Sequence, residues 1–334
     1  MSITRRALLA LAGGAVLVAA GCSSSGTGSP SSTGNGGGGS TGAANTGAAT
    51  TSNGGNIKIG FITKFPVDFY DTMVDAVKTW NGQHSDVQVL FAQGKSGTDD
   101  EGEINAIQSM VSQGVKAIAI TPTSPNVKDE LQKAVDKGIK VVLIDNDIPG
   151  WSGKSSLVAT NNLKGGELAG QWLAQHLPSG AKIAVLQGVL GNPSLDDRVT
   201  GMVKALDDHG SVVTKLPTDC DQTKGLNAAQ DLLTAHPDVQ AIYAACGPPL
   251  LGALQAVKSK GKTGKITMMG FDAAPGEIDA IKAGTEAASV AQFPAKMGSM
   301  GAQAALDAAQ GKSPPANIDT GTEIVTKDNA SQFG

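Results

Sequence analysis

From residue 57 onward, short runs of β-branched and other apolar residues alternate with longer amphipathic stretches. In residues 103–111, for example, apolar side chains recur at the i, i+3 and i+4 spacing of a helix. Strands that are apolar throughout, with helices between them, indicate parallel sheets covered by helices on both faces. The alternation therefore predicts an α/β fold. The predicted strands span residues 57–63, 87–93, 117–121, 141–145, 156–160, 182–187, 212–216, 241–245, 265–271 and 287–291.

The order of these strands favours two similar lobes, each a doubly wound parallel sheet, with a cleft between them. We expect the strands up to about Asn161 to form the first sheet. The second lobe then begins with a helix near residues 163–170, whose small residues suit close packing. No long linker separates the two halves.

The first 22 residues have the features of a secretory signal that ends in a lipidation site. Arg5 and Arg6 precede an apolar run over residues 7–20, which is shorter than the roughly 20 residues that span a bilayer. The segment ends in Ala-Gly-Cys22, which resembles the lipobox of bacterial lipoproteins. We expect Cys22 to carry a lipid, and the alternative is an ordinary secreted protein with a cysteine near its cleavage site. Residues 4–9 also fit a twin-arginine export signal.

Residues 23–56 consist almost entirely of glycine, serine, threonine, alanine and asparagine. Such a segment buries too little apolar surface to offset the entropy lost on ordering, so we expect a flexible tether. The folded part would then begin near Ile57 and stay close to the outer face of a membrane. The predicted location is extracytoplasmic and lipid-anchored.

Composition argues against several classes of function. The net charge is −4 and no basic cluster is present, so a nucleic-acid partner is not expected. None of the four histidines lies near another histidine or a cysteine at metal-ligand spacing. The chain has no Gly-x-Ser-x-Gly elbow and no Walker-A loop. Asp145 and Asp147 form a carboxylate pair, but the aromatic subsites of a glycosidase are missing. We therefore expect no enzyme activity, no cofactor and no metal.

Polar and aromatic side chains recur directly after the predicted strands. Ligands of open parallel sheets bind beyond the carboxyl ends of the strands, so these residues are the candidate site. Carboxylates, amides and an arginine beside aromatic rings suit a neutral polyhydroxylated ligand. An aspartate after a strand is also a common helix N-cap, which is the role we expect for Asp99 and Asp221. We expect Trp151 at the surface or in a hinge. The candidates are Lys64, Phe69, Tyr70, Asp145, Asn146, Arg198, Cys220, Cys246, Asp272 and Gln292.

Residues 57–327 resemble the ribose-binding group of solute-binding proteins that serve ABC importers. The resemblance is carried by residues 224–227 and 231–241, by Gly-Phe-Asp272 with Ala-Gln292, and by Leu-Gln-Gly188 with Asp-Arg198. It implies a type I periplasmic binding protein fold, in which three crossing segments join two α/β lobes that close on a monosaccharide. The lobes it implies are residues 57–161 with 293–321, and residues 162–292 with 322–334.

The resemblance also implies roles for individual residues. Phe69 and Tyr70 match the aromatic pair that stacks on the sugar ring. Asp145 matches the carboxylate that binds sugar hydroxyls. Arg198, Asp272 and Gln292 match further polar contacts, and Gln292 lies at a hinge crossing.

This sequence departs from the ribose-binding pattern at several of these positions. Asn146 stands where an arginine is usual, and Cys220 where an aromatic residue is usual. Cys246 and Gly247 replace an Asn-Asp pair, and Lys64 or Thr63 replaces a serine. We therefore expect a different pentose, a hexose or a polyol rather than ribose.

Cys220 and Cys246 follow consecutive predicted strands. Adjacent parallel strands lie about 4.8 Å apart, so their ends can hold two cysteines within disulfide reach. A disulfide at the pocket floor and a pair of free thiols both fit the sequence.

The function that these features predict is a monomeric, lipid-anchored receptor that delivers a sugar or polyol to an ABC permease. The alternative is a sensory receptor for a signalling sugar that docks on a chemoreceptor or a kinase. A sugar-responsive repressor of the same fold is not expected, because the signal and tether occupy the place of its DNA-binding segment.

Overall fold

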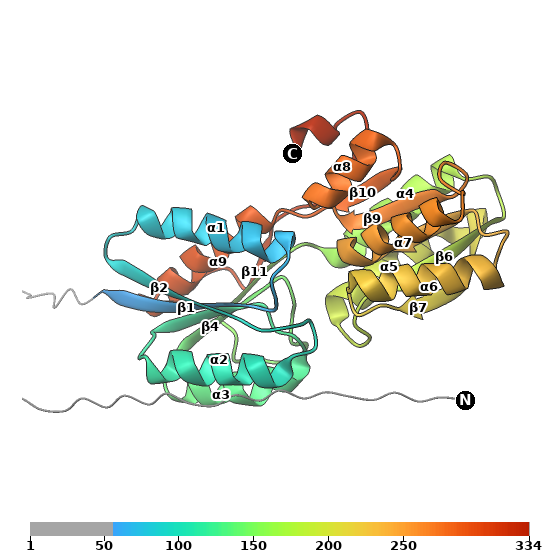
Figure 1. Cartoon of the computed structure of the whole chain (residues 1–334). Helices are drawn as coiled ribbons and strands as arrows, with labels where there is room; N and C mark the ends of the chain where they lie inside the picture. Colours follow the sequence, from blue (N-terminus) through green and yellow to red (C-terminus); the bar gives the residue numbers. More distant parts are fainter. Residues whose placement is uncertain (1–55, 334) are drawn as a thin grey trace, which may run out of the picture. The chain divides into compact units, whose positions relative to one another are not determined.

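The computed structural model describes residues 56–333 of the 334-residue chain. The predicted signal segment, Cys22 and nearly all of the predicted tether lie outside these residues. The described part contains two α/β lobes, which we call the N-lobe and the C-lobe (Figure 1). Within residues 56–333, none of the helices combines the length and apolar character needed to cross a membrane.

The N-lobe is built on a six-stranded sheet of order β11-β5-β4-β3-β1-β2, in which every pairing is parallel. Helices α1 and α9 pack on one face and α2 and α3 on the other, each pair over its own apolar cluster. The strands are β1 (Ile57–Thr63), β2 (Val87–Gln93), β3 (Ala117–Ile120), β4 (Lys140–Ile144), β5 (Ser156–Ala159) and β11 (Asn317–Asp319). The helices are α1 (Asp68–Gly82), α2 (Asp100–Ser112), α3 (Lys128–Asp136) and α9 (Pro294–Ala309).

The C-lobe repeats this plan with the order β12-β10-β9-β8-β6-β7. Helices α4 and α5 cover one face and α6 and α7 the other, while α8 packs near β10 and the C-terminal residues. The strands are β6 (Ala181–Gln187), β7 (Gly210–Pro217), β8 (Ala241–Ala244), β9 (Thr267–Asp272), β10 (Ala288–Ala291) and β12 (Glu323–Thr326). The helices are α4 (Asn162–His176), α5 (Pro193–Leu206), α6 (Gln222–Ala235), α7 (Gly247–Ser259) and α8 (Pro275–Ala283).

The predicted fold class of two parallel-sheet α/β lobes is confirmed. Each predicted strand is present, with ends that differ by at most a few residues. Strands β11 and β12 were not predicted, and β12 pairs with β10 in an antiparallel sense. Residues 160–161, 292–293 and 320–322 connect elements of one lobe to elements of the other.

Glycines let α4 and α5 approach closely, as the small residues of α4 predicted. A Cβ atom on Gly166 would lie 2.2 Å from the carbonyl oxygen of Arg198. A Cβ atom on Gly201 would lie 2.2 Å from the carbonyl oxygen of Leu163. Because no side chain fits at these distances, the contact fixes α5, which carries Arg198, against α4.

Two N-cap predictions are confirmed, and one expectation is wrong. The side chain of Asp99 accepts a hydrogen bond from Gly102 N (3.1 Å), and that of Asp221 accepts one from Lys224 N (2.8 Å). Trp151 is neither at the surface nor in a crossing segment. Its ring is buried in the α2–α3 cluster of the N-lobe, and its Nε1 donates to a glutamine of α3.

Candidate functional site

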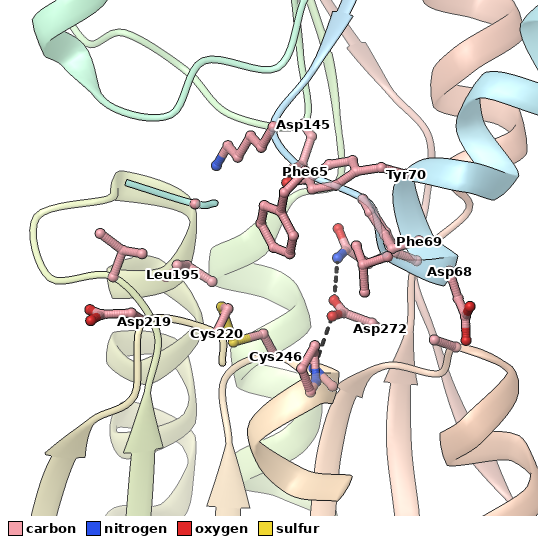
Figure 2. Close-up of a pocket in the computed structure, with 18 of the residues that line it drawn as sticks. Phe65, Asp68, Phe69, Tyr70, Asp145, Leu195, Asp219, Cys220, Cys246 and Asp272 are labelled. Atoms are coloured by element: carbon pink, nitrogen blue, oxygen red, sulfur yellow. Dashed lines mark hydrogen bonds between the residues drawn. A yellow bond between two sulfur atoms is a disulfide. The ribbon is translucent and has the colours of Figure 1, made fainter. Parts of the chain in front are cut away.

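A cavity lies at the carboxyl ends of the strands and is lined by both lobes (Figure 2). The open space at this site, including its mouth to the solvent, is about 760 Å³. The structure brings every candidate residue to its wall: Lys64, Phe69, Tyr70, Asp145, Asn146, Arg198, Cys220, Cys246, Asp272 and Gln292. Their contact with a ligand stays a prediction.

Three aromatic rings of the N-lobe line one side of this cavity. Phe69 and Tyr70 lie in the first turn of α1 and are buried. The Tyr70 ring meets Phe69 edge to face at 5.3 Å and Phe65 at 5.5 Å between centroids. Such mutual packing holds the rings in fixed orientations, as a flat ligand face requires.

Asp145 is the central polar group of the N-lobe wall. It follows β4 with a left-handed backbone (φ 64°), and its side chain is buried. Its Oδ2 accepts hydrogen bonds from Tyr70 Oη (3.4 Å) and Asn146 Nδ2. Its Oδ1 is buried and has no hydrogen-bond partner within residues 56–333. Burial raises the pKa of Asp145, while the nearby cations Lys64 and Arg198 act in the opposite direction.

Lys64 and Asn146 form a hydrogen-bonded pair beside this carboxylate. Lys64 Nζ donates to Asn146 Oδ1 at 2.7 Å, and the same oxygen accepts from Asn192 Nδ2 of the C-lobe. Burial lowers the pKa of Lys64, and Asp145 opposes that shift. The oxygen of Asn146 thus accepts two protein donors and its amide nitrogen donates to Asp145, so its main role here is to connect neighbouring groups.

Arg198, Asp272 and Gln292 form a second polar cluster, in the C-lobe and at a crossing segment. Arg198 Nη1 donates to Asp272 Oδ1 (3.2 Å) and its guanidinium lies 4.0 Å above the ring of Phe271. Gln292 Nε2 donates to the same Asp272 Oδ1 (2.7 Å). Gln292 Oε1 is buried, and the described residues offer it no donor. Burial raises the pKa of Asp272, whereas the Arg198 cation favours its charged form.

The charges on the cavity wall balance in pairs. Arg198 is paired with Asp272, and Lys64 has Asp145 as its strongest opposite charge. Glu277 also borders the cavity and is fully buried. Burial raises the pKa of Glu277 well above its usual range, which favours its neutral form. The buried charges of the wall are therefore paired or neutral. Two further carboxylates also border the cavity: Asp219, which is paired with Lys224, and Asp68, which is exposed.

A disulfide forms part of the C-lobe wall. Cys220 and Cys246 follow β7 and β8, and their sulfur atoms lie 2.06 Å apart with Cα atoms 5.9 Å apart (Figure 2). The sequence left open whether these cysteines form a disulfide or remain free thiols, and the structure shows the disulfide.

Several residues of the wall were not among the predicted site residues. Most of them have apolar side chains, and apolar residues after a strand resemble ordinary core positions in a sequence. The larger apolar ones are Phe65, Val67, Val189, Leu195, Pro248 and Leu251, and the carboxylic acids are Asp68, Asp219 and Glu277.

Two hydrogen bonds connect the lobes beside the cavity. Asn192 Nδ2 donates to Asn146 Oδ1, and Ser194 Oγ donates to the carbonyl oxygen of Asp145 at 3.1 Å. We call these two bonds the interlobe latch. Asn192 is also the N-cap of α5, because its Oδ1 accepts from Leu195 N (3.3 Å). Residues 56–333 contain no group of three or more His, Cys, Asp or Glu side chains placed to hold a metal ion.

Comparison with known proteins agrees with this architecture. Residues 59–313 match the periplasmic binding protein domain family. The chain is 36% identical over 231 residues to the ribose import binding protein RbsB of Bacillus subtilis (strain 168), which covers 69% of this chain and 74% of that protein. It is 31% identical over 271 residues to the D-ribose/D-allose-binding protein of Pseudomonas aeruginosa, covering 78% and 85% of the two chains.

Solved structures show the same fold. An ABC transporter solute-binding protein from Mycobacterium smegmatis, with bound glycerol, is 32% identical and superimposes with a TM-score of 0.77 over 83% of this chain and 96% of that chain. One from Burkholderia graminis, in complex with D-arabinose, is 27% identical with a TM-score of 0.78 over 83% and 97%. By fold and by sequence, this chain belongs to the periplasmic binding protein family.

Proposed function

We propose that this protein captures a small neutral sugar or sugar alcohol between its lobes and delivers it to an ABC importer. The observation that carries the proposal is a pair of unpaired acceptors in one cavity. Asp145 Oδ1 and Gln292 Oε1 are both buried without a donor among the described residues. A buried unpaired acceptor costs about 1–3 kcal/mol, so a ligand that supplies two donors gains that energy.

Hydroxyl groups fit these acceptors better than other donors do. A hydroxyl donates to one group and accepts from another, so it can also use the Lys64 and Arg198 donors. An ammonium or carboxylate ligand would disturb the pairing of the buried cations and anions, Arg198 with Asp272 and Lys64 with Asp145. The rings of Phe69 and Tyr70 add apolar faces for the C–H groups of a sugar. Relatives that bind ribose, allose and arabinose support this ligand class.

The predicted lipid anchor belongs to the same proposal. A lipid on Cys22 and a tether of residues 23–56 would keep the receptor near its permease. Replacing Cys22 with serine is expected to move the protein from the membrane fraction to the soluble fraction. An unchanged membrane fraction would count against the anchor but not against ligand binding.

A thermal-shift screen tests the binding function. The mature chain, without its lipid, is screened against pentoses, hexoses and polyols of four to six carbons. A ligand at about 100 times its Kd adds roughly 2.7 kcal/mol of stability, which raises the melting temperature measurably. The Asp145→Asn variant should lose most of this gain, because the amide presents a donor where the carboxylate presents an acceptor. If no compound stabilises the wild-type protein, the proposal fails. Uptake of the ligand by cells with and without the protein then separates an importer from a sensor.

A further inference from the structure

The cavity wall is divided into a polar and an apolar part. The polar part is formed by Lys64, Asp145, Asn146, Arg198, Asp272 and Gln292, and Asp68, Asp219 and Glu277 add carboxyl groups at the margin of the cavity. The apolar part consists of Phe65, Val189, Leu195, Pro248, Leu251 and the Cys220–Cys246 disulfide. The side chains of the apolar part carry no hydroxyl, amide or charged group, and a disulfide sulfur is at best a weak acceptor.

The apolar residues form a continuous surface. Gly188 lies beside both Leu195 and the disulfide. A Cβ atom built on it would lie 2.4 Å from Leu195 Cδ1 and 3.0 Å from Cys220 Sγ. Leu195 and the disulfide therefore adjoin each other, and Figure 2 shows them on the same side of the cavity.

Phe65 of the N-lobe closes this surface from the opposite side. A Cβ atom on Gly97 would lie 3.4 Å from the Phe65 ring and 3.8 Å from Val189 Cγ2. An N-lobe ring and a C-lobe side chain thus come together where the lobes meet.

Two polar groups border this surface and have protein partners. Asp219 Oδ2 accepts a hydrogen bond from Lys224 Nζ at 2.5 Å, and its side chain remains partly exposed to solvent. The backbone nitrogen of Gly247 donates to Asp272 Oδ2 at 2.9 Å. A ligand hydroxyl that points at Leu195 and the disulfide, away from Asp219, would therefore lose its water partners without gaining a strong hydrogen bond from those side chains.

We propose that the site selects a sugar or sugar alcohol that lacks a hydroxyl at one end and places that methyl end against the Leu195–disulfide surface. The inference rests on the proposed function, since it concerns the ligand of the same cavity. Leu195 and Val189 then determine specificity, because the end of the ligand that lies against them is removed from water and receives no hydrogen bonds from their side chains.

The expected selectivity follows from the cost of burying an unpaired hydroxyl. That cost is about 1–3 kcal/mol, which corresponds to a factor of roughly 5–150 in Kd. The methyl group in its place gains contact with apolar atoms. At the polar end the reverse holds, because removing a hydroxyl there leaves Asp145 Oδ1 or Gln292 Oε1 unpaired.

Calorimetric titration with matched compounds tests this selectivity on the mature chain. The probes are D-fucose against D-galactose, L-rhamnose against L-mannose, and 5-deoxy-D-ribose against D-ribose. In each pair that binds, the deoxy compound should bind at least about 5-fold more tightly. Equal or tighter binding of the hydroxylated compound in every binding pair would overturn the inference and leave the proposed function standing. If no member of any pair binds, the inference is wrong, and the wider screen decides the proposed function separately.

Two variants connect the selectivity to the apolar surface. Val189→Thr keeps the side-chain shape and adds a hydroxyl, and Leu195→Asn adds an amide. Both variants should reduce the ratio between the Kd of the hydroxylated compound and the Kd of the deoxy compound. Leu190→Asn is the matched control, because Leu190 is 57% exposed, lies in the same loop and does not line the cavity. A preference that is unchanged in both Val189→Thr and Leu195→Asn would show that this surface does not set specificity.

Discussion

The interlobe latch should set how readily the lobes close. Asn192 and Ser194 each contribute one neutral hydrogen bond to the N-lobe, and both side chains are buried where they do so. A buried neutral hydrogen bond contributes about 1 kcal/mol net. The double variant Asn192→Ser/Ser194→Ala should therefore destabilise the closed form by about 2 kcal/mol, which is roughly a 30-fold change in the open-to-closed ratio.

The choice of serine at position 192 separates the latch from the helix cap. Serine is as good an N-cap as asparagine, so α5 keeps its first hydrogen bond, but a serine lacks the amide that reaches Asn146. Asp221→Ser is the control for a changed N-cap. Asp221 caps α6 by accepting from Lys224 N (2.8 Å), is exposed and lies outside the crossing segments.

Small-angle X-ray scattering of the ligand-free protein measures the result. Because closure without ligand is itself unfavourable, the ligand-free double variant should have a radius of gyration equal to or slightly larger than that of the wild type, and saturating ligand should bring both to the same smaller value. The Kd of the double variant for a ligand found in the screen should rise by up to about 30-fold relative to the wild type. An unchanged radius of gyration together with an unchanged Kd would refute the idea that these two bonds hold the lobes together.

Three further predictions concern stability. Reducing the Cys220–Cys246 disulfide, which closes a loop of 26 residues, should lower the free energy of unfolding by about 3.5 kcal/mol, seen as a lower urea midpoint. Burial raises the pKa of Glu103 to about 7, so Glu103 binds a proton more tightly in the folded than in the unfolded protein. The stability that this residue contributes should fall by about 3 kcal/mol between pH 4.5 and 7, and Glu103→Gln should flatten that part of the urea-midpoint profile. Gly166→Ala should destabilise the protein by about 1–3 kcal/mol because its Cβ atom would overlap the backbone of α5, whereas Gly82→Ala, with open space around it, should not.

The predicted strands agree with the structure because most of them are buried on both faces. β3 (AIAI) and β8 (AIYA) are buried at every position, so their sequences are apolar throughout and easily recognised. β11 (NID) is short and mostly exposed, and β12 (EIVT) is short with Val325 as its one buried residue. Their sequences contain no apolar run longer than two residues, and their place in the sheets depends on the chain crossing between lobes. The alternation of apolar runs with amphipathic stretches therefore does not identify such strands.

The candidate residues were found for a related reason. Asp145 and Asp272 directly follow the buried strand cores, and the carboxyl ends of parallel strands meet at one edge. What the sequence could not supply was the partner of each group. That Asn146 bonds Lys64 and Asn192 depends on side chains from both lobes. The burial of Trp151 likewise depends on how α2 and α3 pack.

The unpaired acceptors and the latch together explain how a ligand could control closure. In the closed arrangement, Asp145 Oδ1 and Gln292 Oε1 are buried without partners, which costs about 2–6 kcal/mol relative to an open, hydrated site. The two latch bonds return about 1–3 kcal/mol of that cost. Closure without ligand is therefore close to balanced but unfavourable. A ligand whose hydroxyls pair both acceptors removes the penalty only in the closed form, and that difference in binding is what shifts the population.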